Sequence, residues 1–208
     1  MDGVGEGKRR TCAPASWLAW ACVGMLVGMA AGASAQGQPG AGAGPDPDCI
    51  EGLRLYQAQK YDAAEPLLRR CLERREALPP LIALAAISSL GGRPADTRAL
   101  AQRAVAIDSS SVEARYWLGR SWLEDGQKDR ARLEWERALT FSAEHPGVLE
   151  GLARLAMDRG EVAKAYGLLT QLQRVGVDDG WLHRLLADLA RRKGLWADAL
   201  RHWRDALA

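Results

Sequence analysis

Glycine recurs along this 208-residue chain at one fixed interval, and that interval constrains the fold more than any other feature. Gly92, Gly126, Gly160 and Gly194 follow one another in steps of 34 residues. Three further registers keep the same step with small or large apolar residues: Ala85, Gly119, Ala153 and Ala187; Leu84, Leu118, Leu152 and Leu186; Trp135, Leu169 and Trp203. A fixed period of about 20 to 50 residues is typical of proteins built from stacked repeats. The chain is therefore predicted to be an array of similar units.

The segment Ser111 to Leu139, SVEARYWLGRSWLEDGQKDRARLEWERAL, resembles the tetratricopeptide repeat (TPR), a pair of amphipathic helices. The residues that carry the resemblance are Tyr116, Leu118, Gly119, Trp122, Gly126, Ala131, Trp135 and Ala138. The resemblance implies an all-α fold, an α-solenoid of about five antiparallel helix-turn-helix repeats in a right-handed superhelix. Alternation of apolar and polar residues at period two is absent from the chain, so strands are not expected.

The predicted solenoid occupies residues 48–208, with repeats at about 48–78, 79–110, 111–144, 145–177 and 178–208. The first repeat departs from the pattern at Gln59, where glycine is usual. Pro79 and Pro80 open the second, because the first turn of a helix accepts proline and its interior does not.

The N-terminal residues are predicted to be an export signal and a tether. Lys8, Arg9 and Arg10 precede an apolar stretch from Trp17 to Ala33, and Ala33-Ser34-Ala35 has the small residues that a signal peptidase accepts. Residues 1–35 are therefore interpreted as a cleaved signal peptide, and the alternative is a retained membrane anchor. Residues 36–47 are rich in glycine and proline and are predicted to be a flexible linker. The expected location is the periplasm or cell envelope.

Two cysteines, Cys49 and Cys71, lie outside the predicted signal. They flank the turn expected near Lys60 at equal distances, so antiparallel helices would bring them level with each other. Because an exported chain meets an oxidising compartment, a Cys49–Cys71 disulfide is predicted. The alternative is that Cys71 is a buried small residue, since Ala104 and Ala138 occupy its site in later repeats.

Residues that would form a catalytic or metal site are not recognised in the sequence. The chain has no His-Glu-x-x-His, phosphate-loop or Gly-x-Ser-x-Gly motif. His183 and His202 are interpreted as lying on helices a repeat apart, and the five-residue step from His183 to Asp188 puts those two on different faces. No catalytic residue, metal or cofactor is therefore expected, and the net charge of +2 argues against general nucleic-acid binding.

The resemblance implies that the first helices of successive repeats line a concave groove that holds an extended or helical peptide segment of a protein partner. The groove residues it implies are Leu53, Tyr56, Ile82, Tyr116, Arg120, Leu123, Arg154, Met157, Arg184, Asp188 and Arg191. The early part of this set is apolar and the later part is rich in arginine, which suits a ligand with an apolar segment and carboxylates.

The expected function is a non-catalytic protein-binding scaffold, with contact to a membrane only through an uncleaved signal. A second hypothesis is a structural subunit that forms homo-oligomers through an uncovered C-terminal apolar end. That end consists of Trp196, Leu200, Trp203 and Leu207. A third hypothesis, an enzyme, would need a site built from arginines and acidic residues of the groove.

Overall fold

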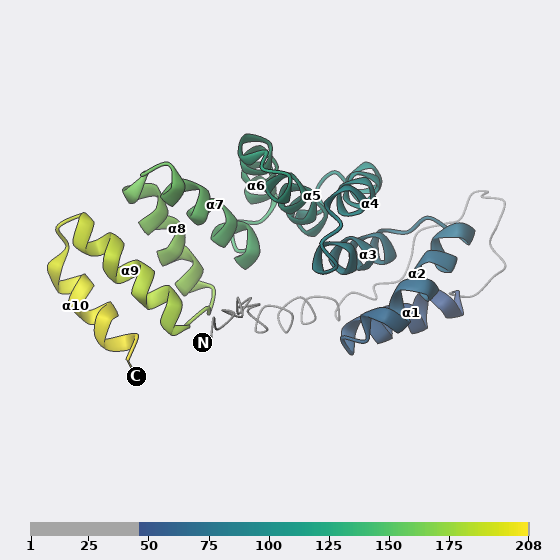
Figure 1. The fold of residues 1–208 in the computed structure, drawn as a ribbon, viewed down its shortest axis with the longest axis horizontal. Helices are drawn as coiled ribbons and strands as arrows, with labels where there is room; N and C mark the ends of the chain where they lie inside the picture. The colour runs from purple at the N-terminus through teal and green to yellow at the C-terminus, as the bar shows by residue number, and fades with distance from the viewer. Residues whose placement is uncertain (1–45, 208) are drawn as a thin grey trace, which may run out of the picture. The chain divides into compact units, whose positions relative to one another are not determined.

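The structure, a computed structural model, describes residues 46–207, which form ten α-helices that follow one another in chain order (Figure 1). The helices are α1 (Pro47–Gln57), α2 (Tyr61–Arg74), α3 (Leu78–Leu90), α4 (Pro94–Ile107), α5 (Val112–Glu124), α6 (Lys128–Phe141), α7 (Pro146–Asp158), α8 (Val162–Arg174), α9 (Gly180–Arg192) and α10 (Trp196–Asp205). Within residues 46–207 there is no strand, and no helix has the length and apolar character needed to cross a membrane. The predicted signal peptide, 1–35, and residues 36–45 of the predicted linker lie outside the described residues.

Each odd-numbered helix packs against the even-numbered helix that follows it, which gives five helical hairpins. The second helix of each hairpin packs against the first helix of the next, and the first helices also contact one another from α1 to α3, from α3 to α5 and from α5 to α7. Contact between neighbouring units alone is the packing of a solenoid. The all-α solenoid predicted from the 34-residue period is confirmed.

The recurring glycines lie in the tight turns between the two helices of a hairpin. Gly92, Gly126, Gly160 and Gly194 have φ between 66° and 76°, a left-handed backbone that glycine adopts without a steric penalty. In the first hairpin Gln59 takes this conformation with φ of 57°, and it is the non-glycine residue with positive φ in the described range. The 34-residue period of the sequence thus reflects a left-handed backbone conformation that recurs in the turn of each hairpin.

Two helices begin one residue before the boundaries expected from the sequence. The side chain of Asp46 accepts a hydrogen bond from a backbone N–H in the first turn of α1, so that helix begins at Pro47. Helix α3 begins at Leu78, and Pro79 and Pro80 follow in its first turn, where backbone N–H groups have no partner within the helix.

The indole of Trp135 fills the core between the third and fourth hairpins. Its ring is 2% exposed, and Nε1 donates a hydrogen bond to the carbonyl oxygen of Tyr116 at 3.1 Å. A methyl group added to Gly119 would lie 2.4 Å from Nε1, and one added to Gly151 would lie 2.5 Å from Cζ3. Since atoms cannot approach so closely, both glycines are required for α5 and α7 to pack against this ring.

Candidate partner-binding surface

The first helices of the five hairpins carry all of the residues that the sequence assigned to the groove. They are Leu53 and Tyr56 on α1, Ile82 on α3, Tyr116, Arg120 and Leu123 on α5, Arg154 and Met157 on α7, and Arg184, Asp188 and Arg191 on α9. Each of these side chains is partly or fully exposed. We call this set the first-helix face. On α1 and α3, the partly buried side chains of Leu53, Tyr56 and Ile82 also pack against the hydrophobic core.

A polar network joins α3 and α5 on the first-helix face. Arg120 donates from Nε to Glu124 Oε1 at 3.0 Å and from Nη1 to the hydroxyl of Tyr116 at 3.4 Å. Ser89 Oγ on α3 donates to the same oxygen of Glu124 at 3.0 Å. The charge of Arg120 is therefore already paired within the chain, which leaves it less available to a ligand than the sequence suggested.

The ring of Tyr116 acts mainly as a spacer between α5 and α7. A methyl group added to Gly147 would lie 2.5 Å from Cε2 of this ring, and the imidazole of His145 lies against it with ring centroids 5.0 Å apart. Burial raises the pKa of the Tyr116 hydroxyl. His145 also contacts Glu113 of α5 at 2.8 Å, so this corner is held by packing and by a polar contact.

Glu150 on α7 is a residue of this surface that the sequence analysis missed. Its side chain is 14% exposed and forms an ion pair with Arg154 at 2.5 Å, while Arg154 is 64% exposed. Burial raises the pKa of the Glu150 carboxyl, although Arg154 and Arg120 act in the opposite direction. The spacing of four residues on one helix was a signal for this pair.

A depression of about 230 Å³ opens where α7 and α9 come near each other. It is lined by Met157, Asp158, Gly160, Val162, Asp188, Leu189 and Arg192. Asp188 forms ion pairs with Arg191 and Arg192, both at 2.8 Å. Arg184 is exposed, and no ion pair within residues 46–207 includes it. Met157 and Asp188 thus line the same depression.

Helix α10 and the turn that follows it expose four large apolar side chains, of which Leu207 lies in the turn. The exposed fractions are 64% for Trp196, 68% for Leu200, 43% for Trp203 and 89% for Leu207. The spacing of these residues places them along one side of the helix. The buried residues of α10 are Ala199 and His202, whereas α6 buries Trp135 with two alanines and α8 buries two leucines with one alanine.

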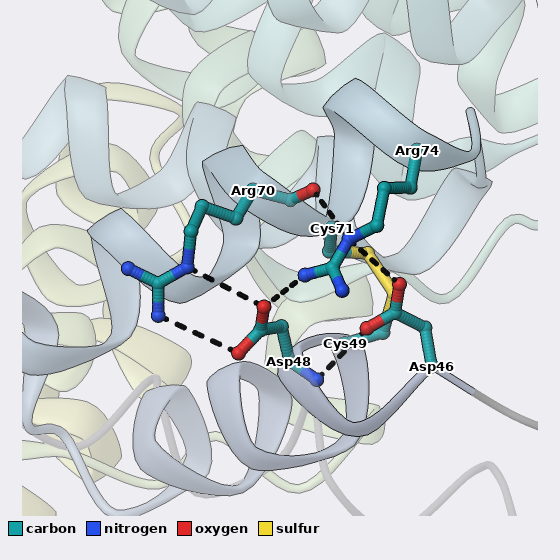
Figure 2. The surroundings of a disulfide bond; sticks show 6 residues. All are labelled: Asp46, Asp48, Cys49, Arg70, Cys71 and Arg74. Carbon is teal, nitrogen blue, oxygen red and sulfur yellow. Dashed lines mark hydrogen bonds and ion pairs between the residues drawn. A yellow bond between two sulfur atoms is a disulfide. The ribbon is translucent and has the colours of Figure 1, made fainter.

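The first hairpin carries a disulfide between α1 and α2 (Figure 2). The Cα atoms of Cys49 and Cys71 lie 5.1 Å apart, and the sulfur of Cys71 is enclosed by the core. Beside the disulfide, Asp48 forms ion pairs with Arg70, at 3.4 Å, and with Arg74. The hydrogen bond from Arg70 lowers the pKa of Asp48. The structure thus has the predicted Cys49–Cys71 disulfide, and Cys71 is not merely a buried small residue.

The interpretation of His183 and His202 as lying on helices a repeat apart is wrong. They lie on α9 and α10, the two helices of the last hairpin, and their Nδ1 atoms are 3.2 Å apart. The partner of His183 Nε2 is Asp178, at 2.6 Å, and not Asp188. Burial, aided by Arg201 and His183, lowers the pKa of His202. Spacing along one helix was the wrong measure, because the contact crosses the hairpin.

Comparison with known proteins identifies the repeat. Residues 91–148 match the family model described as tetratricopeptide repeat. A relative, tetratricopeptide repeat-containing protein trd-1 of Caenorhabditis elegans, is 32% identical over 94 residues, which are 44% of this chain and 12% of the relative. The chain thus spans a small part of that protein's length.

Solved structures show the same fold at low sequence identity. MamA is 20% identical with a TM-score of 0.62, over 75% of this chain and 92% of that chain. PilF of Pseudomonas aeruginosa is 20% identical with a TM-score of 0.67, over 77% of this chain and 73% of that chain. A thermophilic TPR protein of Thermus thermophilus is 20% identical with a TM-score of 0.59, over 77% of this chain and 88% of that chain. Residues 91–148 thus match a tetratricopeptide repeat, and the five helical hairpins have the same fold as these solved structures.

Proposed function

We propose that this protein is a non-catalytic scaffold that binds a peptide segment of a protein partner on its first-helix face. The observation that carries the proposal is that residues on all five first helices remain partly or fully exposed, and that α1, α3, α5 and α7 contact one another in series. Such a face offers a ligand many side chains along its length, which is how a helical groove binds an extended or helical segment.

The chemistry of this face sets what the partner segment should contain. The side chains that α1 and α3 contribute to the first-helix face, Leu53, Tyr56 and Ile82, are apolar or aromatic, so they favour an apolar stretch of the ligand. On α7 and α9 the exposed guanidinium groups of Arg154 and Arg184 favour carboxylates, because guanidinium and carboxylate form paired hydrogen bonds. Arg120 contributes less, since Glu124 already holds it and its side chain is 43% exposed, whereas Arg154, although paired with Glu150, is 64% exposed. The expected ligand is an apolar segment flanked by acidic residues.

The proposed location is the periplasm or cell envelope, reached through the signal predicted at residues 1–35. The disulfide of Cys49 and Cys71 supports this proposal, because disulfides persist in oxidising compartments and are rare in the cytosol. Fractionation of the producing cells, with a gel run without reductant, tests it. A chain found in the cytosolic fraction with free thiols would overturn it.

Photocrosslinking in the producing cells tests the binding face. A photoreactive amino acid is placed at Met157 on α7, and in a matched variant at Leu133, which is 46% exposed on the second helix α6. We expect a crosslinked partner from position 157 alone, and its loss when Arg154→Glu and Arg184→Glu are added. The control reverses Arg137 and Arg201, exposed arginines on second helices, and should keep the adduct. Adducts from position 133 alone would refute the proposal.

A second candidate function, self-association, is favoured by the four exposed apolar side chains of α10 and the turn that follows it. Sedimentation velocity over a range of concentrations tests it with Leu200→Glu as the variant. If this surface joins two copies, the wild type forms a dimer and the variant sediments as a monomer. A wild type that remains monomeric at high concentration would exclude this candidate.

A further inference from the structure

Three potential metal-binding side chains converge inside the last hairpin. His183 on α9 and His202 and Asp205 on α10 each offer an atom, and these atoms all lie within 4.8 Å of one another. The two Nδ1 atoms are 3.2 Å apart, and His183 Nδ1 is 3.9 Å from Asp205 Oδ2. Both imidazoles are buried, whereas the carboxylate of Asp205 is 43% exposed. The cluster is therefore enclosed on the side of the histidines and open to solvent on the side of Asp205.

An outer carboxylate fixes the orientation of His183. Asp178 Oδ1 lies 2.6 Å from His183 Nε2, so this nitrogen carries the proton and donates it. The lone pair of neutral His183 is then on Nδ1, which points at the other two groups. A histidine that binds a metal through one nitrogen and donates its other N–H to a carboxylate is the usual arrangement around protein metal sites.

The repeat register shows that a histidine pair is not a requirement of the hairpin itself. His183 and His202 are 19 residues apart, as are Arg115 and Glu134 of the third hairpin, which form an ion pair at 2.9 Å. In the fourth hairpin the same two positions hold leucines, Leu149 and Leu168. An ion pair or an apolar pair serves this contact elsewhere, whereas here two buried imidazoles contact each other through their Nδ1 atoms, with carboxylates on either side.

We propose that Nδ1 of His183, Nδ1 of His202 and the carboxylate of Asp205 bind a divalent transition-metal ion of the zinc type. Bond lengths of about 2.0–2.2 Å in a tetrahedral site separate the ligand atoms by about 3.3 Å. The nitrogen pair already has that separation, and rotation of the exposed Asp205 side chain brings its oxygen in. Two imidazoles and one carboxylate suit zinc, nickel or copper, whereas magnesium and calcium prefer oxygen ligands alone.

Such a site would fasten α10 to α9. The inward side of α10 buries Ala199 and His202 against α9. A metal shared by the two helices adds to that contact and fixes the orientation of the exposed apolar residues of α10. The inference is independent of the proposed first-helix binding face, because none of its residues belongs to that face.

The test uses the full chain with Cys12→Ser and Cys22→Ser, since free thiolates bind zinc themselves. Calorimetric titration of the metal-free protein with Zn²⁺ should show one site, Co²⁺ should give the visible absorption of tetrahedral nitrogen and oxygen ligands, and Mg²⁺ should give no heat. The thermal midpoint should rise with Zn²⁺. Absence of binding at millimolar Zn²⁺ would overturn the proposal.

Variants distinguish Zn²⁺ binding at this site from nonspecific binding, and loss of the site from a folding defect. The double variant His183→Leu and His202→Leu copies the leucine pair of the fourth hairpin, so it should fold and lose Zn²⁺ binding. Asp178→Asn should weaken binding by about 10- to 100-fold, the effect of losing an outer carboxylate. The control is His145→Asn, a third histidine replaced by a residue that keeps its capping role in α7. Binding that survives the leucine pair, or that is lost in the control, would refute the assignment.

Discussion

Replacement of Gly151 by alanine should destabilise the solenoid, whereas the same replacement at Gly167 should stabilise it. Both glycines lie inside helices, α7 and α8, so alanine gains about 0.8–1.0 kcal/mol of helix propensity at either site. A methyl group at position 167 meets no atom within 4 Å. One at position 151 lies 2.5 to 2.8 Å from three ring carbons of Trp135.

The indole has no room to move away from the new methyl group. Gly119 supports the ring from the other hairpin helix, and Nε1 is held by its hydrogen bond to a backbone carbonyl. Overpacking of this kind costs about 1–3 kcal/mol. With the propensity gain deducted, Gly151→Ala should lose up to about 2 kcal/mol, and Gly167→Ala should gain up to about 1 kcal/mol.

Urea denaturation followed by far-ultraviolet circular dichroism measures both changes, and a second background identifies their cause. Trp135→Leu copies the fourth hairpin, where Leu169 occupies the same position. In that background Gly151→Ala should be neutral or stabilising, because the ring is gone and residues in contact give non-additive effects. If Gly151→Ala costs the same free energy in both backgrounds, or is as stabilising as Gly167→Ala, the packing argument fails.

Three further predictions concern stability. Gln59→Gly should raise the free energy of unfolding by about 1 kcal/mol in urea titrations, because Gln59 has a left-handed backbone that disfavours any side chain; a loss of stability would contradict this. Burial raises the pKa of Glu150, so the folded state holds its proton to higher pH than the unfolded state, and Glu150→Gln should therefore be more stabilising relative to wild type at pH 7 than at pH 4. Equal effects at both pH values would refute that reasoning. Reduction of the Cys49–Cys71 disulfide, which spans 22 residues, should cost about 3 kcal/mol, and a denaturation midpoint that reductant leaves unchanged would contradict the prediction.

The repeat period predicted the backbone of this protein because each recurring residue meets a local steric need. Gly126 and its equivalents allow the left-handed turn, and the departure at Gln59 occurs where the structure has a strained residue of the same conformation. The partners of polar and charged side chains were less predictable. Glu150 shares a helix with Arg154, whereas Ser89 reaches Glu124 from another helix, and a one-dimensional pattern records only the first kind of pair.

The histidine pair shows how a period predicts contacts across a hairpin. Residues 19 apart lie on facing helices, as Arg115 and Glu134 do, so the step from His183 to His202 was a usable signal of contact. Spacing along a single helix does not reveal this contact, because it crosses the hairpin.

The repeat therefore contains two kinds of position, one with a steric requirement and one with a variable side-chain contact. The turn glycines and the small residues beside Trp135 meet steric needs of the backbone, and substitutions there disturb the hairpin itself. The positions 19 residues apart hold an ion pair, two leucines or two histidines in successive hairpins without changing the helix order. Since the fold accepts all three chemistries at that contact, these positions are free to acquire a specific role. A metal-binding pair arises most readily there, because the solenoid already brings the two side chains face to face.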